Sequence, residues 1–386
     1  MGICGTAMGN AALLARAAGH EVLGADQGIY PPMSDVLAGA GITVHAGYDA
    51  GRLEKLGPDL VVIGNAMSRG NPEVEWLLDA GTLAFTSLPA FLHDHVLQGR
   101  RNLVVAGTHG KTTTTSLAAF LLRGAGLDPG YLIGGVPLDP PTGHHLGAAA
   151  DPFVIEGDEY DSAFFDKTAK FLKYLPEIAV INNVEFDHAD IYPDLDAVLL
   201  AFRRLVNLVP RTGLLLLGAD SPHALGLAPR AVSPVRTFGL GPDADWRALG
   251  VEARDGVTRF DAHYQGALFG SFESPLLGVH NVRNALAAIA VGHHVGLTAH
   301  ALADGLRRFR GVKRRLEVVG VARGVTVIDD FAHHPTAVHE TLAALRTGYP
   351  GRRVWAVFEP RSASSCRRVF QADFRSEEHT SELQSH

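Results

Sequence analysis

A lysine and a threonine follow a glycine-rich turn in the segment 107–113, which reads Gly-Thr-His-Gly-Lys-Thr-Thr. The segment comes after an apolar run at 102–106 and leads into a helical pattern at 114–122. The backbone amides of such a turn converge on an anion, and the N-terminus of the helix adds positive potential. The pattern predicts a phosphate-binding loop, in which Lys111 reaches the β- and γ-phosphates of a nucleotide and the Thr112 hydroxyl binds magnesium.

This loop departs from the strict consensus at one position, because Val105 stands where a glycine is usual. We therefore interpret the segment as a variant phosphate loop. A plain strand–helix turn with a solvated lysine is the alternative, but the strand, loop and helix context favours phosphate binding. The predicted nucleotide contacts in the loop are Gly107, Thr108, His109, Gly110, Lys111, Thr112 and Thr113.

Carboxylates follow two other apolar runs. The run at 153–155 leads into Glu-Gly-Asp-Glu-Tyr-Asp at 156–161, and the run at 178–181 leads into a segment that contains Phe-Asp-His at 186–188. In a parallel α/β sheet, ligands bind beyond the carboxyl ends of the strands, where both segments fall. Magnesium prefers oxygen ligands and needs few protein groups where phosphates supply the rest. We therefore predict Glu156 as a magnesium ligand beside the nucleotide and Thr112, with His188 able to complete a second site. A solvated acidic loop and a surface histidine are the alternatives.

Three pairs of adjacent histidines occur, at 144–145, 293–294 and 333–334. Adjacent residues on a strand or helix point in different directions, and neither a cysteine nor a His-x₃-His partner accompanies these pairs in the sequence. We therefore expect the pairs not to form a zinc site.

The composition is that of a globular protein with more than one domain. The chain has 386 residues, of which 46% are hydrophobic and 19% charged, and a net charge of −7, so a basic nucleic-acid-binding surface is not expected. The two cysteines, Cys4 and Cys366, are too few for a disulfide framework. The sequence contains neither an apolar run of membrane-spanning length nor a signal-peptide pattern, and we therefore predict a cytoplasmic protein that binds no membrane.

Apolar strand patterns alternate with helical ones along the chain, which predicts an α/β fold with parallel sheets. We predict domains at 1–100, 101–310 and 311–374, the last with strands at 325–328 and 354–358. The glycine turn at 1–9 leaves almost no room for the strand that normally precedes such a turn, so we expect the first strand to be missing. The segment 375–386 resembles translated sequencing-adapter DNA. We treat it as a non-native tail, and we expect the third domain to be incomplete.

The motifs resemble, in order, those of the Mur ligases, which are ATP-dependent enzymes that join amino acids or peptides to UDP-N-acetylmuramate. The resemblance rests on the phosphate loop, the segments 156–161 and 186–188, Gly-Val-His-Asn-Val-Arg-Asn at 278–284, and the arginine pair at 314–315. Longer stretches, among them 30–34, 158–167 and 329–335, are similar to the branch of murein recycling whose acceptor is the tripeptide L-Ala-γ-D-Glu-meso-diaminopimelate. The resemblance extends from residue 2 to about residue 365.

This resemblance implies a Rossmann-like N-terminal domain that binds the UDP-sugar, a central ATPase domain, and a Rossmann-like C-terminal domain, here truncated, that binds the acceptor. It also implies residue roles. Gly5 and Gly9 would lie against the UDP diphosphate, with Ser68 and Asn71 nearby. His280, Asn281 and Asn284 would contact adenine, Arg315 would contact a phosphate, and Asp330 would contact the ribose or another part of the nucleotide. His333 and Arg361 would face the acceptor. A carbamylated lysine found in many relatives is not expected, because Arg203 stands at that position.

The activity that the resemblance implies begins with phosphorylation of the lactyl carboxylate of UDP-N-acetylmuramate by ATP and Mg²⁺. The amine of the tripeptide then attacks the acyl phosphate and expels phosphate. The catalytic residues would be Lys111, Glu156, His188 and Arg315. Three alternatives remain open: a ligase that accepts L-alanine, an inactive nucleotide-binding fragment of the family, and a nicotinamide dehydrogenase suggested only by the first glycine turn with Asp26 downstream. The sequence predicts no oligomeric state.

Overall fold

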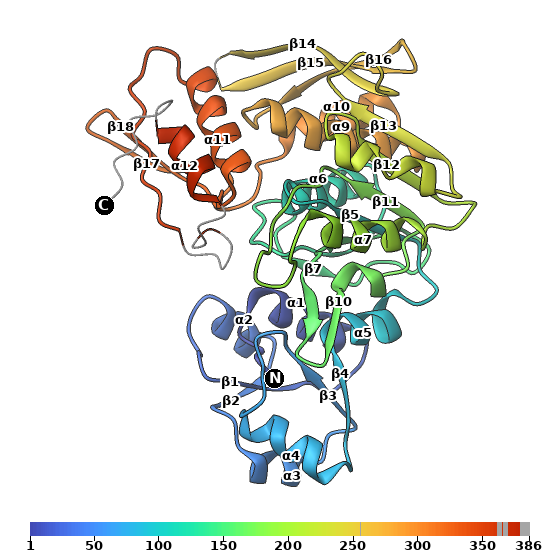
Figure 1. Cartoon of the computed structure of the whole chain (residues 1–386), viewed down its shortest axis with the longest axis vertical. Coiled ribbons are helices and arrows are strands. Elements are labelled where there is room, and N and C mark those ends of the chain that lie inside the picture. The colour runs from blue at the N-terminus through green and yellow to red at the C-terminus, as the bar shows by residue number, and fades with distance from the viewer. Residues whose placement is uncertain (255, 361–364, 366–369, 379–386) are drawn as a thin grey trace.

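The computed structural model describes residues 1–254, 256–360, 365 and 370–378. Its N-terminal elements, blue in Figure 1, form two parallel strand pairs, β1 (Leu23–Asp26) with β2 (Thr43–Ala46) and β3 (Leu60–Ile63) with β4 (Ala84–Ser87). The amino group of Met1 donates to the Val62 carbonyl (2.8 Å) and the Gly2 amide to that of Ala25 (2.8 Å), so the first residues link the two pairs. The helices of this part are α1 (Thr6–Ala17), α2 (Met33–Gly39), α3 (Ala50–Leu56), α4 (Pro72–Ala80) and α5 (Leu88–Leu92), followed by a π-helical turn at His93–Leu97.

A ten-stranded mixed sheet forms the centre of the molecule, in the order β16-β15-β14-β13-β12-β11-β5-β8-β6-β7. The seven central strands of this order, from β14 through to β6, run parallel to one another. At the two edges the pairing is antiparallel, between β6 and β7, between β14 and β15 and between β15 and β16. Their bounds are β5 (Asn102–Ala106), β6 (Gly130–Leu132), β7 (His144–His145), β8 (Phe153–Gly157), β11 (Ile178–Ile181), β12 (Leu214–Gly218), β13 (Val235–Gly239), β14 (Trp246–Arg254), β15 (Val257–Tyr264) and β16 (Ala267–Ser274). The strands predicted at 102–106, 153–155 and 178–181 are confirmed.

Each face of this sheet buries a separate apolar core. One core packs the sheet against α6 (Lys111–Gly124), α9 (Val279–His294) and α10 (Ala299–Arg308), and the other packs it against α7 (Leu195–Val206) and the N-terminal helices. The alternation of the strand β5 explains this division, because Leu103 and Val105 belong to the first core and Val104 and Ala106 to the second. Shorter elements complete the domain: the antiparallel pair β9 (Asp161–Ala163) and β10 (Asp166–Ala169), the helix α8 (Pro222–Leu225), and 3₁₀ turns at Lys170–Lys173 and Ala228–Arg230.

The C-terminal elements, red in Figure 1, lie beside the central sheet. They comprise an antiparallel pair, β17 (Glu317–Ala322) with β18 (Val325–Asp329), and the helices α11 (Pro335–Gly348) and α12 (Gln371–Glu378). The predicted strand at 325–328 is confirmed, but the one at 354–358 is wrong. Val357 is 94% exposed, and within the described part of the chain no neighbouring strand pairs with this segment to satisfy its peptide groups. None of the helices among the described residues is both long and apolar enough to cross a membrane.

Candidate active site

The ends of three neighbouring strands bring the predicted motifs together. In the register of the sheet, Ala106 of β5 pairs with Gly157 of β8 on one side and with Ile181 of β11 on the other. The phosphate loop, the acidic segment and the segment after β11 therefore leave the sheet side by side, as expected for parallel strands. Together they line a cavity of about 580 Å³.

Two glycines of the loop are required by its backbone shape and by its neighbours. Gly107 has φ +128°, and a Cβ there would lie 2.9 Å from the Asn183 carbonyl oxygen. Gly110 has φ +81°, and its Cβ would lie 2.4 Å from the Asn284 side-chain oxygen. The helix α6 begins directly after it at Lys111, three residues earlier than the pattern predicted. The loop is thus a tight turn at a helix N-terminus, the geometry that favours anions.

Lys111 is largely buried, with 13% of its side chain exposed, and it pairs with Glu159. Its Nζ donates to the carbonyl oxygens of Gly107 (2.6 Å) and Thr108 (3.2 Å) and to Oε2 of Glu159 (3.0 Å). Burial alone would lower the pKa of Lys111, but nearby carboxylates, above all Glu159, outweigh it and raise the pKa above its ordinary value. The lysine is therefore a fixed cation at the floor of the loop, suited to an anionic phosphate.

The predicted magnesium ligands separate into two neighbouring groups. The Thr112 hydroxyl donates to Oε1 of Glu156 (3.0 Å), whose Oε2 accepts from the Gly134 amide (2.9 Å). His188 pairs with Glu159 instead, through a contact of 3.2 Å between Nε2 and Oε1. Burial is the largest influence and would lower the pKa of His188, but the hydrogen bond and the charge of Glu159, together with Asp187, outweigh it and raise the pKa. One potential ligand atom each of Asp158, Glu159 and His188 lies within 4.8 Å of the other two, so the three residues could share a metal ion. Oxygen-rich groups of this kind fit Mg²⁺.

The segment predicted to contact adenine lies at the start of α9 and lines the cavity. Asn281 donates to the Leu277 carbonyl (2.8 Å), and Asn284 donates to Asn281 (3.1 Å) and accepts from Thr114 (3.2 Å), so both amides brace the phosphate loop from behind. His280 is partly buried, which lowers its pKa, and its buried Nδ1 atom has no partner among the described residues. An unpaired buried polar atom in the wall of a cavity fits a nucleotide base or sugar.

Three predicted residues of the C-terminal part also line the cavity, namely Arg315, Asp330 and His333. Arg315 reaches the Thr112 hydroxyl at 3.4 Å. Asp330 accepts from the amides of Leu316 (2.7 Å) and Ala332 (2.8 Å) and so shapes the loops on either side of it. The remaining acceptor-facing prediction, Arg361, lies outside the described residues.

The predicted UDP contacts, Gly5, Gly9, Ser68 and Asn71, do not line this cavity. Two of them have evident structural tasks. A Cβ on Gly9 would lie 2.3 Å from the Met33 sulfur, and Asn71 caps α4 by accepting from the amides of Glu73 and Val74. Their contact with a UDP-sugar therefore stays a prediction.

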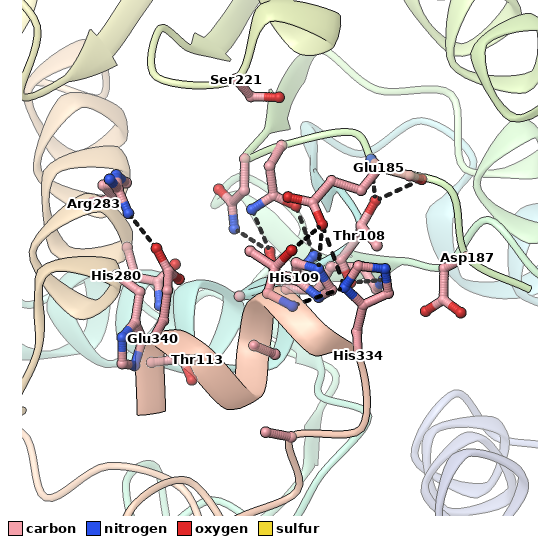
Figure 2. Close-up of a pocket in the computed structure, with 18 of the residues that line it drawn as sticks. Thr108, His109, Thr113, Glu185, Asp187, Ser221, His280, Arg283, His334 and Glu340 are labelled. Carbon is pink, nitrogen blue, oxygen red and sulfur yellow. Dashed lines mark hydrogen bonds and ion pairs between the residues drawn. The ribbon is translucent and has the colours of Figure 1, made fainter. Parts of the chain in front are cut away.

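Sequence reasoning missed several residues of the cavity wall. The Asn183 side chain accepts from the His109 amide (2.8 Å), and Asn182 donates to the Thr114 hydroxyl (3.2 Å), so both amides fix the loop. Glu159 was part of the acidic run but was not singled out. Glu185, Arg283, His334 and Glu340 also line the cavity, several of them joined by hydrogen bonds (Figure 2). The signal available for the asparagines was their place directly after β11.

Models of known families match three successive parts of this chain. The "Mur ligase family, catalytic domain" matches residues 1–99, the "Mur ligase middle domain" residues 105–292, and the "Mur ligase, glutamate ligase domain" residues 314–373.

Individual proteins resemble the chain over nearly its whole length. It is 46% identical to the UDP-N-acetylmuramate–L-alanyl-γ-D-glutamyl-meso-2,6-diaminoheptandioate ligase of Escherichia coli K12, over 94% of this chain and 78% of that protein. It is 37% identical to the UDP-N-acetylmuramate–L-alanine ligase of Salinibacter ruber, over 93% of this chain and 73% of that protein. The crystal structure of a murein peptide ligase from Psychrobacter arcticus 273-4 superposes with a TM-score of 0.79 and 42% identity, over 94% of this chain and 78% of that one. The three-domain α/β architecture expected from the sequence is thereby confirmed.

Proposed function

Since this chain belongs to the Mur ligase family, we propose that it is an ATP-dependent ligase that joins L-alanyl-γ-D-glutamyl-meso-diaminopimelate to UDP-N-acetylmuramate. The observation that carries the choice of acceptor is the level of identity, 46% to a tripeptide ligase against 37% to an L-alanine ligase. Because the reaction consumes ATP and a UDP-sugar, we place it in the cytoplasm. A nicotinamide dehydrogenase is not supported, because both oxygens of the Asp26 carboxylate already accept hydrogen bonds within the protein, from the amides of Cys4 (2.8 Å) in the glycine turn and of Gly28 (3.0 Å).

The first chemical problem of this reaction is electrostatic, because the lactyl carboxylate must attack the γ-phosphate of ATP, an anion meeting an anion. Lys111 and Arg315 both line the cavity and supply positive charge to it, and Arg315 reaches the hydroxyl of the neighbouring Thr112. Mg²⁺, when bound, would neutralise charge on the phosphate oxygens. Two groups of residues would hold it: Thr112 with Glu156, and His188 with Asp158 and Glu159. The product of this step is an acyl phosphate, in which phosphate has become a leaving group.

The second step is attack of the tripeptide amine on the acyl phosphate, which water would otherwise destroy. The cavity is closed by residues of two domains, with Arg315 and Asp330 of the C-terminal part facing Thr112 and Glu156 of the central part. Such a wall limits the access of water to a reactive intermediate. We propose His333 as a contact to the acceptor, because it lines the cavity from the C-terminal part.

The direct test is ligation measured with the two acceptors side by side, L-Ala-γ-D-Glu-meso-diaminopimelate and L-alanine, at equal concentrations of UDP-N-acetylmuramate and ATP. We expect turnover of the tripeptide to exceed that of L-alanine by several orders of magnitude, because site groups that pair with the additional polar groups of the tripeptide would be left unpaired by L-alanine. Comparable turnover of L-alanine would contradict the acceptor assignment. Binding of an ATP analogue without turnover of either acceptor would favour the inactive fragment.

Replacement of the loop lysine tests the nucleotide assignment. We expect Lys111→Ala to reduce ligation by at least ~10³-fold, because the fixed cation that faces the phosphates is lost. Binding of UDP-N-acetylmuramate, measured by calorimetry, should remain, since the predicted UDP contacts lie outside this cavity. Unchanged turnover would refute the role of the loop.

A further inference from the structure

A second cluster of ligating side chains lies in the wall of the cavity, apart from the groups proposed for magnesium. His109 Nε2 lies 3.2 Å and His334 Nδ1 3.3 Å from the same oxygen of Glu185, Oε2. The two imidazole rings are 4.7 Å apart between centroids, and Figure 2 shows the three side chains converging. They come from the phosphate loop, the segment after β11 and the residue before α11, and one ligand atom of each lies within 4.8 Å of the others.

The hydrogen bonds of His334 leave an electrostatic conflict at this cluster. Its Nε2 lies 3.2 Å from the carbonyl oxygen of Phe186, which can only accept, so Nε2 carries the hydrogen. Its Nδ1 accepts from the Thr336 amide (3.3 Å), so a lone pair of Nδ1 faces this side. Nδ1 and the Glu185 carboxylate are then two acceptors in contact. A proton on Nδ1 or a cation bound between Nδ1 and Glu185 would each remove this repulsion, and each would take the lone pair of Nδ1 from the long contact with the Thr336 amide.

The ligand set and its supports match those of transition-metal sites. Two histidines and a glutamate form one of the sets found around zinc in enzymes, where a fourth position stays open for water or substrate. The outer partners are also in place. The Phe186 carbonyl orients the His334 ring, and the Thr336 hydroxyl donates to Glu185 (2.7 Å). The main chain of His109 is fixed by Asn183, which accepts from its amide (2.8 Å).

We propose that His109, Glu185 and His334 bind a divalent transition-metal ion of the Zn²⁺ class, with its open coordination position toward the cavity. Because His334 belongs to the C-terminal domain and the other two ligands to the central domain, the bound ion ties the start of α11 to the phosphate loop. The site needs no assumption about the ligation reaction. Only one histidine of the pair 333–334 takes part, and the ligands come from distant segments, which is why the spacing of the histidine pairs did not reveal it.

The test is metal binding by the full chain, freed of any affinity tag and treated with a chelator, in the presence of millimolar Mg²⁺. Zn²⁺ is titrated by calorimetry, and Co²⁺ is titrated by visible absorption, which reports low-coordinate nitrogen and oxygen ligation. We expect one ion per chain. In His334→Ala and in Glu185→Gln, affinity should fall by more than the ~10–100-fold that loss of an outer partner costs. The matched control is His333→Ala, which removes the adjacent imidazole and should leave Zn²⁺ affinity unchanged.

Circular dichroism shows whether each variant folds. If His334→Ala does not fold, the test rests on Glu185→Gln, which keeps the shape of the side chain. Loss of the ion in the ligand variants together with retention in His333→Ala supports the site. Absence of a 1:1 complex in the wild-type chain overturns it and leaves a proton-bridged contact. Unchanged affinity in either folded ligand variant overturns it as well.

Discussion

Glu159 is the residue on which the charges of the cavity floor depend. Its side chain is 2% exposed, and it contacts both the Lys111 ammonium and the His188 imidazole. Burial would raise the pKa of Glu159, but Lys111, together with His188, lowers it, so the carboxylate stays ionised. One buried carboxylate thus raises the pKa of both basic neighbours, and both of them lower its own pKa.

Glu159→Gln tests this dependence while nearly preserving the shape of the side chain. We expect the free energy of unfolding to fall by about 3 kcal/mol, because a buried ammonium loses its main counter-charge. The pKa of His188, now above its ordinary value, should fall below it, since burial remains and the hydrogen bond to a carboxylate is lost. Urea unfolding and NMR titration of the imidazole measure the two effects. Glu177→Gln, which breaks a partly exposed pair with Arg101, is the control and should cost at most about 1 kcal/mol. Equal losses in the two variants would contradict the central role of Glu159.

At the scale of elements, α9 acts as a rigid support for the phosphate loop. Asn284 on α9 lies directly behind Gly110, and it is joined to Asn281 and to Thr114 of α6 by hydrogen bonds. The position of the loop is therefore fixed by packing against a helix far away in the sequence.

Gly110→Ala measures how closely the two elements fit. We expect a loss of about 2–4 kcal/mol in stability, of which ~1 kcal/mol comes from a positive φ and the rest from the contact with Asn284. Gly126→Ala, beyond the other end of α6, is the matched control. Its φ is similar (+92°), and a Cβ there would meet nothing within 4 Å, so it should lose only the ~1 kcal/mol of backbone strain. Chemical unfolding of both variants gives the difference. Equal losses would mean that α9 yields to the added methyl group.

The strands that carry the site could be predicted because each is a continuous apolar run followed by a distinctive motif, as at 102–106 before the phosphate loop. Which side chains pair with one another within the cavity could not be predicted from the sequence. His188 was expected at a second site near Glu156, but its partner Glu159 was not identified, because the pairing depends on how two loops bend after leaving the sheet. The strand expected at 354–358 had the right residues, but a strand also needs a neighbour, and a single sequence does not specify one.

For the whole molecule, the linker between the central and C-terminal domains is itself paired to the site. The Leu138 amide donates to the Gly311 carbonyl (2.9 Å) and the Lys313 amide to that of Val136 (2.9 Å), so the linker lies along the segment 136–139. The same loop begins at Gly134, whose amide contacts Glu156. Elsewhere in the cavity wall, Arg283 of α9 contacts Glu340 of α11 at 2.6 Å (Figure 2). The linker and the proposed magnesium carboxylate are therefore connected through one loop, and a second contact joins the C-terminal part to α9.

The Asp139 carboxylate joins the central domain to Arg310 at the start of this linker. Because this carboxylate can be protonated, the contact can be tested by changing the pH. Arg310 donates to the carboxylate from Nε (2.9 Å), Nη2 (2.8 Å) and the backbone amide (2.9 Å), and the side-chain hydrogen bond from Arg310 lowers the pKa of Asp139 below its ordinary value. A carboxyl with a lowered pKa in the folded state contributes stability above its unfolded pKa of about 4, and that contribution is lost as the pH falls through the lower folded value. We therefore expect Asp139→Asn to be less stable than the wild-type chain by a constant amount above about pH 5, and the difference to shrink below about pH 4.

Urea unfolding of both chains between pH 7 and pH 3 measures this difference. Asp304→Asn is the control, because Asp304 pairs with Arg307 and Arg308 of the same helix, α10, on its exposed side, and the substitution should change stability by no more than about 0.5 kcal/mol. If the linker contact also sets the site, Asp139→Asn should weaken ATP-dependent ligation at neutral pH while Asp304→Asn should not, because only the former releases the loop that holds Glu156. A stability difference that stays constant down to pH 3, or ligation equal in the two variants, would show that the linker does not depend on this carboxylate.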